Sequence, residues 1–117
     1  MSYMLLIIEP AGQRQERGPV AGEQVYAEML EFTAALQARG VLQASSSLAS
    51  TQSGARLQIR SGQRHVVDGP FAEAKEIVGG FFLVDVATRD EALAIAAECP
   101  AAAFATVEVR AVGACYT

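Results

Sequence analysis

The chain has 117 residues, 51% hydrophobic and 19% charged, which is enough apolar content for one core and too much for a disordered protein. The net charge of −4 argues against nucleic acid or an anionic membrane as the main partner, since both need a basic surface. Cys99 and Cys115 belong to no CxxC pair or His/Cys cluster, so neither a disulfide framework nor a metal site is predicted. We therefore expect one soluble, cytoplasmic domain over 1–117 that uses no metal and no cofactor.

The first predicted element is a strand over residues 3–8, a continuous apolar run. This run ends at Glu9-Pro10 and is far shorter than the ~18 apolar residues that a membrane span requires. It also lacks the basic start of a signal peptide. We interpret it as a buried strand.

A helix is predicted next, over 22–39, after a polar surface loop over 10–22. Its apolar residues recur at steps of four, three and four, at Val25, Met29, Phe32 and Leu36. Gly40 is placed to cap its end, and a weak strand over 41–48 follows.

The second half of the chain repeats this scheme, beginning with a β-branched and aromatic strand over 78–86. Thr88 and Glu91 then have the spacing of a capping box at the start of an Ala-rich helix, which ends at Cys99-Pro100. Residues 106–110 alternate as a final strand. Two such units predict an α+β fold, a ferredoxin-like βαββαβ sheet with both helices on one face.

An inserted β-hairpin is predicted between the two halves. Residues 56–60 alternate between polar and apolar side chains, Ser61-Gly62 can turn, and residues 65–67 are extended again.

The helix-free face of this sheet is also apolar. The strand over 78–86 directs Phe81 and Leu83 to one face and Phe82 and Val84 to the other. Because the helices cover only one of these faces, we expect a second copy of the chain to cover the other, in a symmetric homodimer.

The segment from Asp68 to Glu76, DGPFAEAKE, followed by GGFFLVD from Gly79 to Asp85, resembles the signature of the DGPF-motif subgroup of the YCII-related (YciI-like) family. The resemblance covers nearly the whole chain. It implies a ferredoxin-like fold that pairs into a dimeric α+β barrel, most members of which have no established activity. Bacterial members often lie near, or are fused to, alternative sigma factors, which implies a functional link to such a factor.

One family feature does not transfer to this sequence. YciI-like relatives often carry a His on the first helix, thought to pair with an acidic residue in the cleft. This chain has Val25-Tyr26-Ala27 in that helix and no His.

Asp68 has two readings. Its carboxylate can accept hydrogen bonds from the following backbone, in a turn where Pro70 fixes φ and Gly69 takes a conformation that other residues avoid. Alternatively, it is a general acid or base at a cleft mouth.

Two further residues are candidates to assist Asp68 in catalysis. His65 is the only histidine, but three residues before Asp68 in a strand it faces the opposite side. Lys75 could bind an anionic substrate or polarise a carbonyl, and otherwise belongs to a solvated turn. The residues predicted to contact a ligand are Phe71, Glu73, Glu76 and Gly80.

Glycines and an aspartate complete the candidate residues. Gly79-Gly80 permits close approach of a neighbouring strand or a ligand. Asp85 is predicted to lie at the strand end or to pair with an arginine such as Arg110.

Two functions fit these residues. The first is a dimeric module that binds a small molecule or regulates a partner. The alternative is a cofactor-free enzyme, of isomerase, lyase or dehydrochlorinase type, in which Asp68 moves a proton on a small organic acid.

Overall fold

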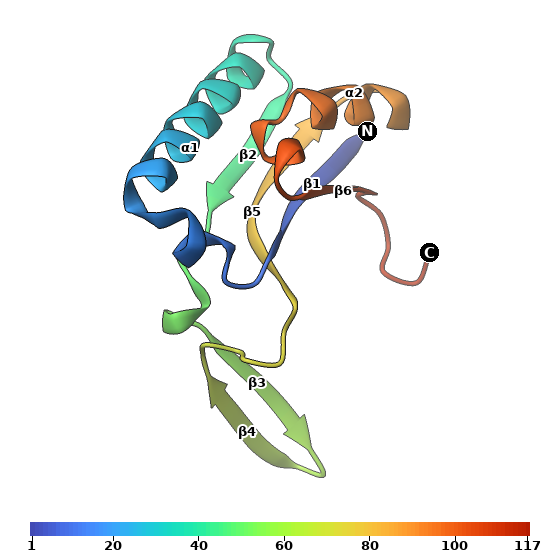
Figure 1. The fold of residues 1–117 in the computed structure, drawn as a ribbon. Helices are drawn as coiled ribbons and strands as arrows, with labels where there is room; N and C mark the ends of the chain where they lie inside the picture. The colour runs from blue at the N-terminus through green and yellow to red at the C-terminus, as the bar shows by residue number, and fades with distance from the viewer.

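The computed structural model describes residues 1–117 and contains a four-stranded antiparallel sheet (Figure 1). Its strands are β1 (Ser2–Pro10), β2 (Leu42–Ser47), β5 (Glu76–Asp85) and β6 (Thr106–Ala111), in the spatial order β2-β5-β1-β6. With β1 and β5 central, this is the strand order of a ferredoxin-like sheet, and the predicted α+β fold is confirmed. The strand ends lie within two residues of those predicted.

Helix α1 (Gln13–Ala38) begins earlier than predicted. The polar stretch before residue 22 is helical from Gln13, with a break at Gly18, where φ is 80° and ψ is 168°. Pro19 then starts the main helix, because its fixed φ suits a first helical position and its missing N–H is not needed there. The predicted loop over 10–22 is therefore wrong. The predicted end is confirmed, since Gly40 takes a left-handed φ of 73°.

Helix α2 (Arg89–Glu98) begins at the predicted cap. The hydroxyl of Thr88 accepts a hydrogen bond from the Glu91 amide at 3.1 Å, and the Glu91 carboxylate accepts one from the Ala87 amide at 2.9 Å. A 3-10 turn, η2 (Pro100–Ala103), follows at once and leads into β6. Neither helix is both long enough and apolar enough to cross a membrane.

The core lies between the helices and one face of the sheet. Along β1, Tyr3, Leu5 and Ile7 are buried, while the residues between them are half-buried on the opposite face. In β5, Phe82 is buried and meets Phe32 of α1 edge to face, with ring centroids 5.1 Å apart. The predicted division of the strand over 78–86, with Phe82 and Val84 on one face and Phe81 and Leu83 on the other, is confirmed.

The centre of the opposite face of the sheet is apolar and has no helix over it, and edge strand β6 adds Glu108 and Arg110 to this face. Met4 and Leu6 of β1 pair directly with Leu83 and Phe81 of β5, and all four are half-buried by one another. We name these four residues the open sheet face.

The predicted hairpin consists of β3 (Ala55–Arg60) and β4 (Gln63–Asp68). It forms a separate two-stranded sheet that projects beyond the end of the main sheet (Figure 1). A 3-10 turn, η1 (Thr51–Ser53), leads into it from β2. We name residues 55–68 the arm.

Candidate functional site

A cleft of about 950 Å³ lies between α1, from Arg14 to Thr33, and the sheet. Its apolar wall includes Ile7 of β1, Phe82 of β5 and Met29 of α1. Its polar lining includes Arg14 and Arg17 from the first turns of α1 and the end of β2 over 45–47. The break at Gly18, which is itself in the lining, separates the first turns of α1 from its main part. A volume of this size is typical of small-molecule sites.

An ion pair between Glu9 and Arg14 forms the floor of the cleft. Arg14 Nε lies 2.6 Å from Glu9 Oε1, which has no well-directed hydrogen bond and is balanced by this charge contact alone. Arg14 also donates to the carbonyl oxygens of Leu48 at 2.8 Å and Gly79 at 3.3 Å. The Glu9 side chain is 9% exposed and that of Arg14 is 32% exposed. A carboxylate this buried depends on its partner cation.

The paired glycines of β5 make room for these contacts. A Cβ on Gly79 would overlap the Glu9 carboxylate, and one on Gly80 would lie 2.8 Å from the carbonyl oxygen of Ser46 in β2. The predicted close approach of a neighbouring strand is confirmed at Gly80, which also lines the cleft.

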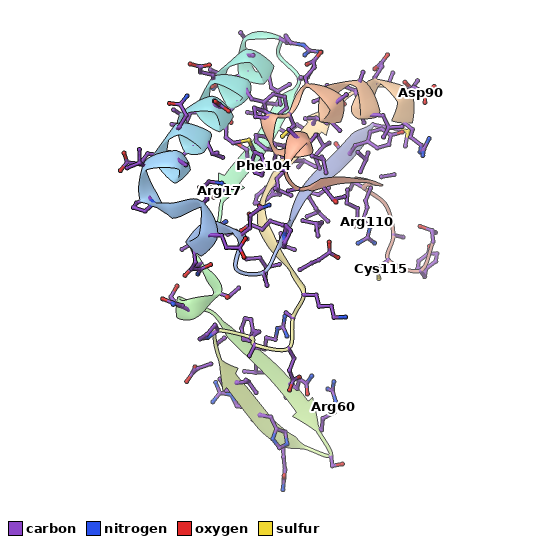
Figure 2. All side chains as sticks on the ribbon, in the orientation of Figure 1. Arg17, Arg60, Asp90, Phe104, Arg110 and Cys115 are labelled. Atoms are coloured by element: carbon purple, nitrogen blue, oxygen red, sulfur yellow. The ribbon has the colours of Figure 1, made fainter.

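Arg17 is a fixed cation with no carboxylate partner. Its guanidinium lies 4.5 Å from the ring centroid of Phe104, and it donates to the side-chain oxygen of Gln13 at 3.1 Å. Gln13 in turn donates to the Phe104 carbonyl at 2.7 Å. Arg17 and Phe104 lie together where the start of α1 approaches the segment before β6 (Figure 2). These contacts leave most of the guanidinium N–H groups available to an anion in the cleft.

A smaller hollow of about 230 Å³ lies beside the DGPF segment. It is lined by Pro70, Phe71 and η1, and it shares Glu9 and Arg14 with the cleft. The ion pair therefore separates the two hollows. Phe71 is held from the arm side by Arg56, whose guanidinium lies 4.1 Å from the ring centroid.

The DGPF turn is closely packed at its second residue. A Cβ on Gly69 would overlap the carbonyl oxygen of Thr51, and the Gly69 amide donates to the Gly54 carbonyl at 2.8 Å. Gly69 thus serves close backbone approach, with no positive φ. The predicted hydrogen bonds to the Asp68 carboxylate are not formed.

The three predicted catalytic residues are exposed and line neither hollow. Asp68 ends β4 opposite Ala55, and His65 lies opposite Gln58 on the other side of the arm, as the strand period predicts. Lys75 is exposed in the segment before β5, where its carbonyl accepts from the Ala11 amide at 2.8 Å. Within one chain, these side chains do not form a cluster.

The predicted ligand contacts are divided in the same way. Phe71 lines the smaller hollow and Gly80 lines the cleft, whereas Glu73 and Glu76 are exposed and line neither. A turn closed by the hydrogen bond from the Ala74 amide to the Phe71 carbonyl, at 3.0 Å, follows the DGPF segment, and Glu76 already belongs to β5 and pairs with Pro10.

The predicted place of Asp85 at the strand end is confirmed, and the alternative, a pair with Arg110, is not formed. Asp85 lies at the end of β5, where its carboxylate is 3.3 Å from the N-terminal ammonium of Met1. Arg110 lies opposite Met4 in β6.

Glu9, Arg14 and Arg17 were missed by sequence reasoning, although Glu9 carries a readable signal. It continues the odd-numbered series of Tyr3, Leu5 and Ile7, so its side chain points toward the core. A carboxylate in that position requires a nearby cation. The helical turn that supplies Arg14 and Arg17 was hidden within the predicted loop.

No group of three or more His, Cys, Asp or Glu side chains is close enough to hold a metal ion. Cys99, at the end of α2, has its pKa raised by burial, and hydrogen bonds from the Ala101 and Ala102 amides oppose that shift. Its thiol contacts the Met29 sulfur at 3.9 Å. It therefore behaves as a packed, protonated side chain.

Comparison with known proteins places these features in a family. A segment of 46 residues is 50% identical to an uncharacterized protein of Rhizobium meliloti (strain 1021), R00369, and covers 39% of this chain and 37% of that protein. The family model of the YCII-related domain matches residues 1–114. The chain therefore belongs to the YCII-related family.

Proposed function

We propose that this protein is a homodimeric, cytoplasmic binding protein for a small organic acid, held in the cleft under α1 with its acid group on Arg17. The observation that carries the proposal is a fixed arginine without a carboxylate partner at an apolar cleft in an acidic protein. Arg14 and Arg39 each pair with a glutamate, at 2.6 Å and 2.8 Å. Arg17 has only the Phe104 ring and Gln13.

The lining of the cleft favours an acid with an apolar body. Ile7, Met29 and Phe82 offer a carbon-rich wall, and the end of β2 offers serine hydroxyls at the rim. A guanidinium can bind a carboxylate through two parallel N–H groups, which fixes the orientation of the ligand. An aromatic or short aliphatic carboxylate combines both features.

The proposal can be tested with benzoate and hexanoate as acidic probes and benzamide as a neutral probe. We expect the two carboxylates to shift the backbone NMR signals of cleft residues such as Ile7 and Phe82. Substitution Arg17→Gln should weaken carboxylate binding by about 10- to 100-fold, the worth of a charged hydrogen bond, and leave benzamide binding unchanged. Arg39→Gln, which removes an exposed ion pair with Glu98, is the matched control.

Equal carboxylate affinity in Arg17→Gln and the unsubstituted protein would refute the proposal. Signal changes confined to the arm would refute it as well.

Acid–base catalysis by Asp68 is the competing hypothesis, and the test separates the two. Asp68 lies outside the lining of the cleft, so Asp68→Asn should leave carboxylate affinity unchanged. A lower carboxylate affinity in Asp68→Asn would instead indicate that Asp68 takes part in ligand binding.

The homodimer is proposed from the open sheet face, where Met4, Leu6, Phe81 and Leu83 form a continuous apolar surface. Packing two such faces together would form the dimeric barrel that the family resemblance implies. Sedimentation should show a dimer that Leu6→Asp dissociates.

The implied link to a sigma factor remains a prediction, and a sigma factor copurifying with the tagged protein would support it.

A further inference from the structure

The arm is the part of the chain with the least support from the rest. Every residue of β3 and β4 is exposed, and their ladder joins only each other. An isolated two-stranded hairpin is at best marginally stable in water. Even so, the two strands of the arm pair in an unbroken register, from Ala55 opposite Asp68 to Arg60 opposite Gln63.

One side of the arm carries three large aliphatic side chains. Leu57 and Ile59 lie on the same side of β3, and Val66 of β4 lies directly opposite Leu57. Their exposed fractions are 53%, 62% and 47%. Arg64 lies opposite Ile59, so it shares this side. Large aliphatic side chains gathered on one exposed surface indicate an interface.

The arm is also basic, whereas the rest of the chain is acidic. It carries three arginines, Arg56, Arg60 and Arg64, against Asp68, a net charge of +2 in a chain of −4. The remaining residues, 1–54 and 69–117, which we name the body, therefore carry −6. From Gly18 to Ala38, α1 has Glu23, Glu28 and Glu31 and no basic residue. A surface of opposite charge to the arm is thus present on every other copy of the chain.

We propose that the arm is a dimerisation arm, whose apolar side, which also carries Arg64, docks on the acidic body of a second copy of this chain. This inference rests on the proposed homodimer and adds to it a second contact, distinct from the open sheet face. The arm projects past the end of the main sheet, with Arg60 near its tip (Figure 2). It therefore extends beyond its own core toward a surface that only another molecule can supply.

The test compares dimer dissociation constants by sedimentation equilibrium. In the arm variant, Leu57→Asp with Ile59→Asp, we expect the constant to rise about tenfold or more, because two apolar contacts are replaced by carboxylates facing an acidic partner. Tyr116→Asp is the control, since Tyr116 is an 89% exposed large hydrophobic residue that lies outside both the arm and α1. The arginine variant, Arg64→Glu, should weaken the dimer and reduce its salt dependence, and Arg60→Glu, on the opposite side of the arm, should have a smaller effect.

The position of the arm on a second copy can be measured by mixing two forms of the protein. One form carries a nitroxide at Gln63→Cys in a Cys115→Ser background, and the other is isotope-labelled. The nitroxide should broaden the NMR signals of body residues in the isotope-labelled copy. Thermal unfolding followed by circular dichroism checks that each variant keeps its core. If the arm variant unfolds, the arginine variant carries the test, because it changes only exposed charges.

The outcomes separate the two proposals. A protein that stays monomeric at millimolar concentration overturns both the homodimer and the arm contact. A dimer that Leu6→Asp dissociates but the arm and arginine variants leave unchanged overturns the arm contact alone. Intermolecular broadening confined to other arms also overturns docking on the body.

Discussion

The main sheet and the arm are both antiparallel and both alternate in hydrophobicity, yet they end in opposite environments. In the main sheet Leu5 and Val84 are fully buried, whereas in the arm Leu57 and Ile59 are more than half exposed. The difference arises from what lies against each sheet, since α1 and α2 cover one and nothing in the same chain covers the other. Period-2 patterning thus predicts a strand without predicting its burial.

Between the two regions, the DGPF turn acts as the joint. Its Gly69 contacts η1 through the backbone, and its Phe71 is stacked under Arg56 of the arm. Substitutions should therefore lower the free energy of unfolding most in the core of the body, less in the joint and least in the arm.

The largest effect is expected in the core of the body. Leu36→Ala should lower the free energy of unfolding by about 2–5 kcal/mol, because a fully buried side chain leaves a cavity. Leu57→Ala in the arm should change it by less than about 0.5 kcal/mol when measured in dilute, monomeric protein. Urea unfolding compares the two, and equal losses would contradict the separation of arm and core.

The ion pair below the cleft should come next. Arg14→Met should cost about 3 kcal/mol, at the low end for a broken buried pair because Arg14 is partly exposed. The double variant, Arg14→Met with Glu9→Gln, should lose less free energy of unfolding than Arg14→Met alone, because it leaves no buried charge unpaired. Arg39→Met breaks an exposed pair and should cost less than about 1 kcal/mol. An Arg14→Met variant no less stable than Arg39→Met would show that the pair is solvated.

The joint should be less sensitive than the core. Gly69→Ala should cost about 1–3 kcal/mol, because its Cβ would overlap backbone at Thr51 that cannot move aside cheaply. Gly22→Ala is the matched control, since its Cβ would meet no atom and alanine favours helix. Thermal unfolding should show a lower midpoint for Gly69→Ala and an unchanged or higher one for Gly22→Ala. A lower midpoint for Gly22→Ala than for Gly69→Ala would show that the close packing at Gly69 does not contribute to the stability of the fold.

The smallest effect concerns pH and the two cysteines. Burial raises the pKa of Cys99 above its ordinary value of 9.0, so the native state keeps a proton that the unfolded state loses. The resulting stabilisation is complete below pH 9 and is lost as pH rises through the native pKa. Urea unfolding at pH 8 and pH 10 should show a decline that Cys99→Ala reduces. A thiol reagent should label exposed Cys115 first, and equally fast labelling of Cys99 would contradict its burial.

Local signals in the sequence determined most of the secondary structure and the fold. The apolar run over 3–8, the Thr88 cap, Gly40 and the division of Phe81 from Phe82 each act through neighbouring residues, so they can be read without a structure. The hairpin was equally visible, because Ser61-Gly62 lies between two extended segments. These elements suffice for a ferredoxin-like order of strands and helices.

Only the tertiary structure decided the location of the cleft and the roles of its residues. The segment from His65 to Glu76 holds the three predicted catalytic residues, yet all three end in solvent. His65 and Asp68 are exposed because they belong to the arm, which has no core of its own, and Lys75 is exposed in the segment before β5. Glu9 and Arg14 come from a strand end and a helical turn, and their pairing through Gly79 depends on the position of β5 beside β1. Contacts between segments that are distant in the sequence leave no repeating pattern of residues, so the sequence alone could not reveal them.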